Sequence, residues 1–136
     1  MSNHRRAAIS IPTGERTALV DITDDVDRAL HELNVHEGIL VLFCPHTTAG
    51  LTINEGADPD VANDITETLA RLVPAQAGYR HAEGNADAHV KSTLTGVSLS
   101  VAVEDGRVVL GRWQRIFFCE FDGPRSRRIW VRFIGT

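Results

Sequence analysis

GILVLFC, residues 38–44, is the stretch of sequence from which the fold is most directly predicted. The run is too short for a typical helix and contains no charged side chain, so it predicts a strand. A strand that is apolar at every position is typical of the centre of a sheet with both faces covered. We therefore expect residues 38–44 to form a central strand that is buried on both sides.

The residues before this run predict two short strands and a helix. Strands are expected at residues 7–11 and 17–21, with a turn at 12–14 between them. Thr23 is expected to cap a helix that begins with acidic residues, which favour the positive end of a helix dipole. The apolar stripe of this helix comprises Val26, Ala29, Leu30 and Leu33.

Two more helices and several strands are predicted after the central run. Asp58 caps the second helix and Pro59 occupies its first position, where a missing amide costs nothing. Asn85 caps the third helix, expected at residues 86–95 and ended by Gly96. The positions expected to face inward on the second helix are Val61, Ala62, Ile65, Leu69 and Leu72. Further strands are expected at 51–54, 97–103, 108–110, 116–121 and 127–134.

This order of elements predicts an α+β fold: one compact domain over residues 1–136, with mixed or antiparallel sheets and about three helices. The chain contains 43% hydrophobic and 24% charged residues, which argues against disorder. Its formal net charge of -4 gives no reason to expect nucleic-acid binding. No signal peptide and no membrane span are expected. Cys44 and Cys119 lie in apolar runs, as reduced thiols of a cytoplasmic protein do.

Three histidines stand in polar surroundings and are candidate metal ligands. His46 follows the central run, whereas His81 and His89 flank the start of the third helix. Three imidazoles with an open fourth position suit a catalytic Zn²⁺, but their spacing matches no standard metal motif. Loop and helix-cap hydrogen bonding is an equally good interpretation of these side chains. His31 and His36 are interpreted as surface residues.

Charged side chains near the C-terminus form a second group of candidates. Glu120 follows an apolar strand, and a buried carboxylate needs a partner, so Glu120 is either an edge residue or part of a polar site. Gln114 shares its parity and is expected on the same face. Arg125 comes just after a turn and is suited to phosphate, although it can equally pair with one of the many carboxylates.

Three segments together resemble the YjbQ-like family, also called secondary thiamine-phosphate synthase. They are PHTTAGLTINEGADPDVANDI, YRHAEGNADAHVKSTLTG and LGRWQRIFFCEFDGPRSRRIWVRFIG, and the resemblance extends from about Thr17 to Gly135. It implies a compact α+β domain that assembles as a homotrimer. It also implies a weak transferase activity, in which a pyrimidine pyrophosphate joins a thiazole phosphate and pyrophosphate leaves.

The resemblance, together with the chemistry above, defines the expected site. Its catalytic residues are expected to be Glu55, His81, His89 and Glu120. The residues that bind the phosphorylated substrates are expected to be Thr47, Thr48, Asn54, Asn85, Lys91, Gln114 and Arg125. The metal ligands are expected to be His46, His81 and His89. The divalent ion is either Zn²⁺ at these histidines or Mg²⁺ bound with pyrophosphate.

Two other functions remain open at this stage. One is metal-assisted hydrolysis of a phosphate ester, which needs the same metal ligands. The other is a module that binds a metal or a phosphorylated metabolite without turnover. Loss of turnover with an intact fold, after replacement of His81 or His89 by alanine, distinguishes an enzyme from such a module.

Overall fold

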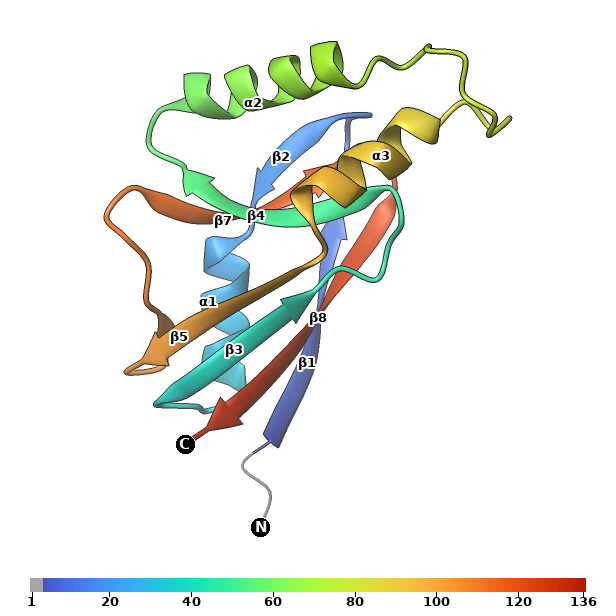
Figure 1. Ribbon diagram of the computed structural model, residues 1–136. Helices are drawn as coiled ribbons and strands as arrows, with labels where there is room; N and C mark the ends of the chain where they lie inside the picture. Colours follow the sequence, from blue (N-terminus) through green and yellow to red (C-terminus); the bar gives the residue numbers. More distant parts are fainter. Residues whose placement is uncertain (1–3) are drawn as a thin grey trace.

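The computed structural model describes residues 4–136, which form two sheets and three helices (Figure 1). The helices are α1 (Thr23–Glu32), α2 (Pro59–Leu72) and α3 (Ala86–Thr95). The strands are β1 (His4–Pro12), β2 (Ala18–Asp21), β3 (Gly38–Phe43), β4 (Ala49–Glu55), β5 (Ser98–Glu104), β6 (Arg107–Val108), β7 (Gln114–Glu120) and β8 (Ser126–Gly135).

The strands form two antiparallel sheets that pack on each other. The order in sheet A is β1-β8-β3-β5-β6, and the order in sheet B is β2-β7-β4. The α+β prediction is therefore confirmed, with antiparallel rather than mixed pairing. The shared core includes Leu40, Leu42, Val131 and Phe133 from sheet A, and Leu51, Ile116 and Phe118 from sheet B.

The central run forms β3, between β8 and β5, as expected. The prediction that both of its faces are buried is wrong. Leu40 and Leu42 are fully buried, but Ile39 is 56% exposed and Phe43 is 38% exposed. The reason is the alternation of a strand, which turns these two side chains to the outer face of sheet A. No helix of the described chain covers that face (Figure 1).

The start of α1 differs from the prediction, because Thr23 lies inside the helix and does not cap it. Asp21 provides a nearby acceptor instead, since its Oδ1 accepts from the Thr23 amide at 3.0 Å. The Thr23 hydroxyl accepts from the Ile116 amide at 2.8 Å. This side chain therefore joins α1 to β7 rather than satisfying an amide of its own helix.

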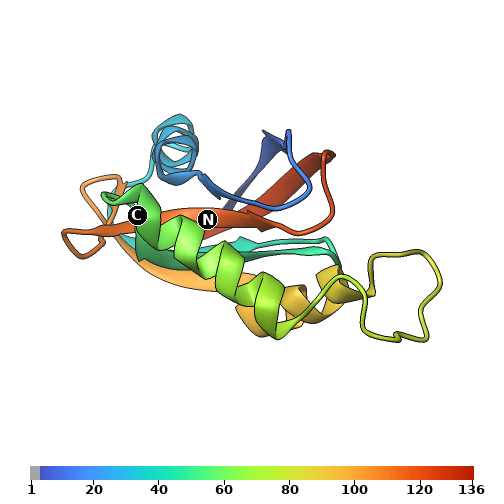
Figure 2. The ribbon, with the colours of Figure 1, turned by 90° about the horizontal axis from the view of Figure 1, so that it is seen from above.

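The capping of α2 is confirmed, but its burial is not. Asp58 Oδ1 accepts from the Asp60 amide at 2.9 Å, and Pro59 begins the helix. None of the residues of α2 is buried, and Leu72 is 70% exposed. The expected inward stripe is thus only partly covered, because α2 lies over the edge strand β2 rather than over the middle of a sheet (Figures 1 and 2).

The predicted range of α3 is confirmed, and this helix covers the outer face of sheet B. Ala88 packs against Cys119 of β7 and against Phe121, which directly follows β7, in a second small core. Gly96 ends the helix with φ of 86°, which favours glycine. None of the three helices within residues 4–136 is long and apolar enough to cross a membrane.

Candidate functional site

A polar hollow of about 310 Å³ opens where the loop between β3 and β4 meets the N-terminus of α3. Its lining comprises Pro45, His46, Thr47, Thr48, Glu83, Asn85, His89, Asp122, Arg125 and Arg127. A second hollow of about 420 Å³ extends along α3 to Gly96 and Val97. The two hollows share His46, Thr47 and His89 as lining, so they adjoin at these residues and are called the depression below.

The position of His46 is fixed by the backbone of β8. Its Nε2 lies 3.1 Å from both the nitrogen and the carbonyl oxygen of Arg128, so the tautomer decides which of them it bonds. Burial and the charge of Arg127 lower the pKa of His46. The ring is therefore neutral at pH 7, and Nδ1 is the atom left for a ligand.

His81 and His89 lie close together, but His46 does not join them as a third ligand. The two rings stand nearly perpendicular with centroids 5.2 Å apart, and His81 Nε2 is 3.6 Å from Glu83 Oε2. Among the described residues, no three His, Cys, Asp or Glu side chains are arranged to hold a metal ion. His81 lies in the loop between α2 and α3, which extends away from the body (Figure 2). The expected Zn²⁺ site thus requires movement of this loop.

Asp122 organises the polar side of the hollow. Its Oδ2 accepts from Asn85 Nδ2 and from Arg125 Nη2, each at 2.9 Å, and its carbonyl accepts from Arg125 Nε at 2.8 Å. Burial raises the pKa of Asp122, but the hydrogen bonds from Asn85 and Arg125 outweigh it and hold the pKa below the usual value. The carboxylate is therefore ionised and keeps Arg125 in place.

Asn85 occupies the N-cap position of α3, but its side chain does not cap the helix as predicted. Its amide group bonds Asp122, while its Oδ1 is buried and has no hydrogen-bond partner within residues 4–136. The N-terminus of α3 therefore has no side-chain cap. Backbone amides in this position are suited to an anion.

Two sequence comparisons identify the family of this chain. A family model described as UPF0047 protein YjbQ-like matches residues 7–136. The chain belongs to the YjbQ/UPF0047 family. It is 51% identical over 125 residues to a UPF0047 protein of Methanocaldococcus jannaschii, covering 92% of this chain and 91% of the relative. It is 46% identical over 128 residues to UPF0047 protein YugU of Bacillus subtilis, covering 93% and 97%.

Solved structures show the same fold. An uncharacterized YjbQ/UPF0047 protein from Clostridium acetobutylicum superposes with a TM-score of 0.90 at 47% identity, covering 94% of this chain and 99% of its own. A hypothetical protein from Aeropyrum pernix K1 superposes with a TM-score of 0.92 at 35% identity, covering 97% and 99%.

Several expected site residues of this YjbQ-like chain do line the depression. His46, Thr47 and His89 line both hollows, whereas Asn85 and Arg125 line the polar one. Thr48 also lines the polar hollow, but its side chain is buried. Its hydroxyl accepts a hydrogen bond from Arg127 Nη2 at 2.9 Å.

Glu120 is fully buried and does not line the hollow, in contrast to its expected catalytic role. Arg127 and Thr13 donate to its carboxylate at 2.8 Å and 2.7 Å, and the Asp122 amide donates at 3.0 Å. A catalytic carboxylate has to reach its substrate, whereas this one is enclosed by its partners. Glu120 therefore positions Asp122 and Arg127.

Lys91 is also buried away from the hollow, so the substrate contact expected of it is not formed. Its Nζ donates to Asp87 Oδ2 at 2.8 Å, and Arg16 donates to the same carboxylate at 3.1 Å. The cause is the helical period, which turns Lys91 toward sheet B while His89 lies half-buried beside the two hollows. This ion pair anchors the helix on which Asn85 and His89 are carried.

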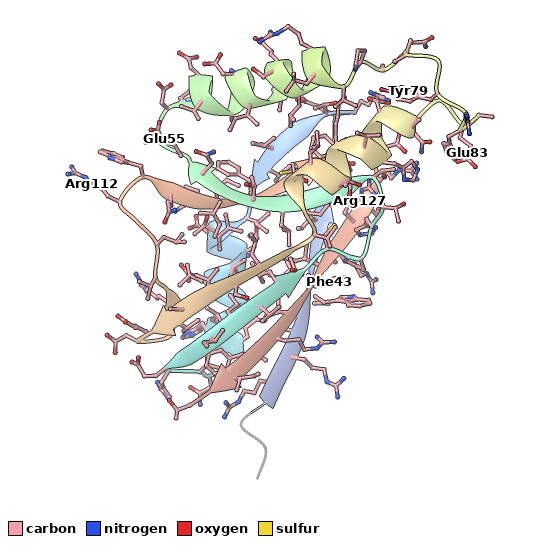
Figure 3. All side chains as sticks on the ribbon, in the orientation of Figure 1. Phe43, Glu55, Tyr79, Glu83, Arg112 and Arg127 are labelled. Atoms are coloured by element: carbon pink, nitrogen blue, oxygen red, sulfur yellow. The ribbon has the colours of Figure 1, made fainter. Side chains whose placement is uncertain are left out.

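Asn54, Glu55 and Gln114 lie at the other end of sheet B. Glu55 pairs with Gln114 at one end of the β4–β7 ladder, and Ala49 pairs with Glu120 at the other. Six residues of strand separate these ends, a distance of about 20 Å. Figure 3 shows Glu55 and Arg127 far apart accordingly. Within one chain, these three residues do not belong to the depression.

Two residues outside the expected set, Arg127 and Glu83, also line the polar hollow. Arg127 shares the inward parity of Ile129, Val131 and Phe133 in β8, and this parity was a usable signal that an arginine points into the core. It is the partner that the buried Glu120 requires. Glu83 is exposed but lines the polar hollow. Cys44 is a free, buried thiol, and burial raises its pKa.

Proposed function

We propose that this chain is a transferase of the thiamine-phosphate synthase type, which joins a pyrimidine pyrophosphate to a thiazole phosphate at the depression around His46 and His89. The observation that carries the proposal is the pair of hollows that meet at these two histidines. Each hollow has the size of a small-ligand site. A reaction between two small molecules needs two adjoining sites of this kind.

The polar hollow is suited to the pyrophosphate group. Arg125 uses Nε and Nη2 in its hydrogen bonds within residues 4–136, which leaves Nη1 for an anion. The uncapped N-terminus of α3 adds backbone amides beside it. A guanidinium held in place by Asp122 stabilises charge on a leaving group without reorganising during the reaction.

The reaction needs the protein mainly to position the two reactants and to neutralise the charge of the leaving pyrophosphate. The thiazole nitrogen forms a bond to the pyrimidine methylene carbon, and the bond from that carbon to the pyrophosphate oxygen breaks. The nitrogen lone pair is free, so no strong base is needed. His46 and His89, on the wall that both hollows share, would orient the two reactants.

A divalent ion is proposed to accompany the pyrophosphate. Glu83 and Asp122 line the polar hollow, and Mg²⁺ typically combines one or two carboxylates with substrate phosphates. Bound Mg²⁺ would supply additional charge neutralisation on the leaving pyrophosphate. The three histidines fit Zn²⁺ less well, because they do not converge in this structure. Elemental analysis of the freshly purified wild-type protein and of His89→Ala distinguishes Mg²⁺ from Zn²⁺. Stoichiometric zinc in the wild type that is lost in the variant would contradict the Mg²⁺ proposal and show a resident zinc centre.

We also propose that the chain forms a homotrimer in the cytoplasm. The exposed apolar side chains Ile39, Trp130 and Ile134 support association, because contiguous exposed apolar patches mark interaction sites. Two free, buried cysteines support a reducing compartment.

The activity is tested by incubating the purified protein with pyrimidine pyrophosphate, thiazole phosphate and Mg²⁺, and by measuring thiamine phosphate. His89→Ala and Arg125→Ala are expected to reduce the rate roughly 10- to 150-fold, as the loss of a charge-assisted hydrogen bond does, while circular dichroism shows an intact fold. Arg107→Ala, on the far hairpin, is the matched control and should keep the wild-type rate.

Two results would overturn the proposal. One is the absence of thiamine phosphate above background at any Mg²⁺ concentration. The other is an equal effect of the site variants and the control variant. Stabilisation of the fold by either substrate without turnover would instead assign the depression to a binding module for phosphorylated metabolites.

A further inference from the structure

The loop between β1 and β2 lies behind the polar hollow and does not line it. It comprises residues 13–17, and none of them belongs to the lining of either hollow. The loop nevertheless bonds to two elements that do contribute lining residues, the segment between β7 and β8 and the helix α3. Contacts of this kind can fix the geometry of a site without touching its ligand.

Thr13, at the start of this loop, bonds to both backbone groups of Arg125. The Thr13 amide donates to the Arg125 carbonyl at 2.9 Å. The Arg125 amide in turn donates to Thr13 Oγ1 at 3.0 Å. Thr13 is only 8% exposed. The backbone of Arg125 is therefore held from inside the molecule, although its side chain is half exposed at the hollow.

The hydroxyl of Thr13 connects this backbone to the buried carboxylate of Glu120. Thr13 Oγ1 lies 2.7 Å from Glu120 Oε1 and 3.1 Å from the Arg125 carbonyl oxygen. A hydroxyl has one proton, and the shorter contact with the charged acceptor takes it. The same oxygen accepts from the Arg125 amide. Thr13 thus relates the position of Arg125 to that of the buried pair Glu120–Arg127.

The next residues of the loop hold the same segment at a second point. The Gly123 amide donates to the Arg16 carbonyl at 3.1 Å. A Cβ at position 123 would collide with the carbonyl oxygen of Glu15, so the two backbones are in direct contact. Arg16 also donates from Nη2 to Asp87 of α3 at 3.1 Å. The loop therefore joins the segment after β7 to α3, which form two walls of the polar hollow.

We infer that Thr13 is a positioning residue, which sets the affinity of the polar hollow for a diphosphate through Arg125. The guanidinium of Arg125 is held by Asp122, and its backbone is held by Thr13. With both ends held, Nη1 is presented to an anion without reorganisation. The inference rests on the proposed function for the identity of that anion, which is the pyrophosphate group.

Removal of the Thr13 hydroxyl should displace Arg125 while the core stays filled. Valine has the shape of threonine but lacks the hydroxyl, so Thr13→Val leaves the Arg125 amide without its acceptor. The segment after β7 then has to move for this amide to find another acceptor. Such a movement shifts the guanidinium, and a misplacement of about 1 Å can cost roughly 100-fold in rate.

Binding of inorganic pyrophosphate in the presence of Mg²⁺, measured by isothermal titration calorimetry, tests the inference. Thr13→Val is expected to weaken binding about tenfold, the lower end for loss of one charge-assisted hydrogen bond. Thr13→Ser keeps the hydroxyl and should bind within about twofold of the wild type, the usual margin for an independent change. This rescue would not occur if only the bulk of the side chain mattered.

Thr23→Val is the matched control. Thr23 is 3% exposed, and its hydroxyl also accepts from a strand amide, that of Ile116 at 2.8 Å. Thr23 lies outside the lining of both hollows and makes no bond to Arg125. Its variant should lose stability in urea as Thr13→Val does, but should keep the wild-type Kd for pyrophosphate.

A double-mutant cycle separates an action through Arg125 from an action through Arg127, which also lines the polar hollow. In an Arg125→Ala background, Thr13→Val is expected to change the Kd less than about twofold, because the group that Thr13 positions is already absent. A tenfold loss that persists in this background would mean that the hydroxyl acts through the Glu120–Arg127 pair, and would overturn the inference.

The inference is also overturned if the wild-type chain does not bind pyrophosphate, if Thr13→Val binds it as tightly as the wild type, or if Thr13→Ser or Thr23→Val shows the same loss. Thiamine phosphate formation is measured on the same samples. Pyrophosphate binding with the expected cycle but without thiamine phosphate contradicts only the proposed reaction. Turnover with equal KM in Thr13→Val and Thr23→Val contradicts only this inference.

Discussion

Arg127 and Glu120 form a buried ion pair that joins β8 to β7 at the base of the polar hollow. Their side chains are 5% and 0% exposed. Thr13, Thr48 and the Asp122 amide complete the hydrogen bonds of the pair. Because removing two charges from water offsets most of their attraction, such a pair adds little net stability. Its main effect is to fix the backbone from which Asp122 and Arg125 reach the hollow.

Removing one member of this pair should destabilise the fold far more than removing both. Arg127→Met leaves the Glu120 carboxylate buried without a counter-charge, which typically costs about 3–5 kcal/mol. The double variant Arg127→Met/Glu120→Leu should recover most of this loss. Urea unfolding of both variants and of the wild type measures the effect. Additive losses in the double variant would mean that the two charges act independently.

The fold should lose stability at acid pH through three buried or half-buried carboxyls. In Asp87, Glu120 and Asp122, burial raises the pKa, but hydrogen bonds and ion pairs outweigh it and leave the pKa lowered. A lowered pKa gives stability that is complete above the unfolded-state values near 4 and is lost as the pH falls through the folded-state values. The urea midpoint between pH 6 and pH 2.5 should therefore fall, and less steeply in Arg127→Met/Glu120→Leu.

His46 should add a separate pH dependence near neutrality. Burial and Arg127 lower the pKa of His46 from 6.5, so near this pH the unfolded chain binds a proton that the folded chain does not bind. Stability then rises with pH through this range and decreases as the pH falls below about 6.5. His46→Gln should flatten the slope of the urea midpoint between pH 7 and pH 5. His36→Gln, in the loop before β3, is the matched control, and equal slopes in both variants would contradict this assignment.

Local patterns predicted the elements of the fold well, because their causes are local. The helix Ala86–Thr95 follows from apolar spacing and Gly96, and Asp58 with Pro59 fixes the start of α2. Whether an apolar surface is covered depends instead on contacts between residues far apart in the sequence. The outer face of β3 is apolar but has no cover within the described chain, and the apolar stripe of α2 is only partly covered.

The candidate site was predicted only in part, because it also depends on contacts between segments far apart in the sequence. His46 and His89 come together because loops at neighbouring ends of elements meet there. The family resemblance placed Glu55 and Glu120 in one expected site, although the antiparallel register puts them at opposite ends of the β4–β7 ladder. Register is set by long-range pairing, which spacing along one strand does not reveal.

Lys91 gives the sharpest contrast between the sequence-based site and the structural one. If Lys91 contacted the substrate, its replacement would raise KM for the pyrimidine pyrophosphate and leave the stability of the fold unchanged. The structure instead pairs its Nζ with the buried Asp87 carboxylate at 2.8 Å. Lys91→Met should therefore destabilise the fold by about 3 kcal/mol, as loss of a buried partner charge does, with KM changed less than about twofold, as expected for a group that makes no ligand hydrogen bond.

Arg125→Ala is the matched variant for Lys91→Met, because both remove one cation and Arg125 is half exposed at the hollow. It should show the opposite pattern, with a raised KM and an almost unchanged urea midpoint, because a surface ion pair such as Arg125–Asp122 adds at most about 1 kcal/mol. Steady-state kinetics and urea unfolding on the two variants measure both quantities. A Lys91→Met protein with wild-type stability and a tenfold higher KM would show that Lys91 contacts the substrate. In that case α3 would have to rotate so that its buried face meets the ligand.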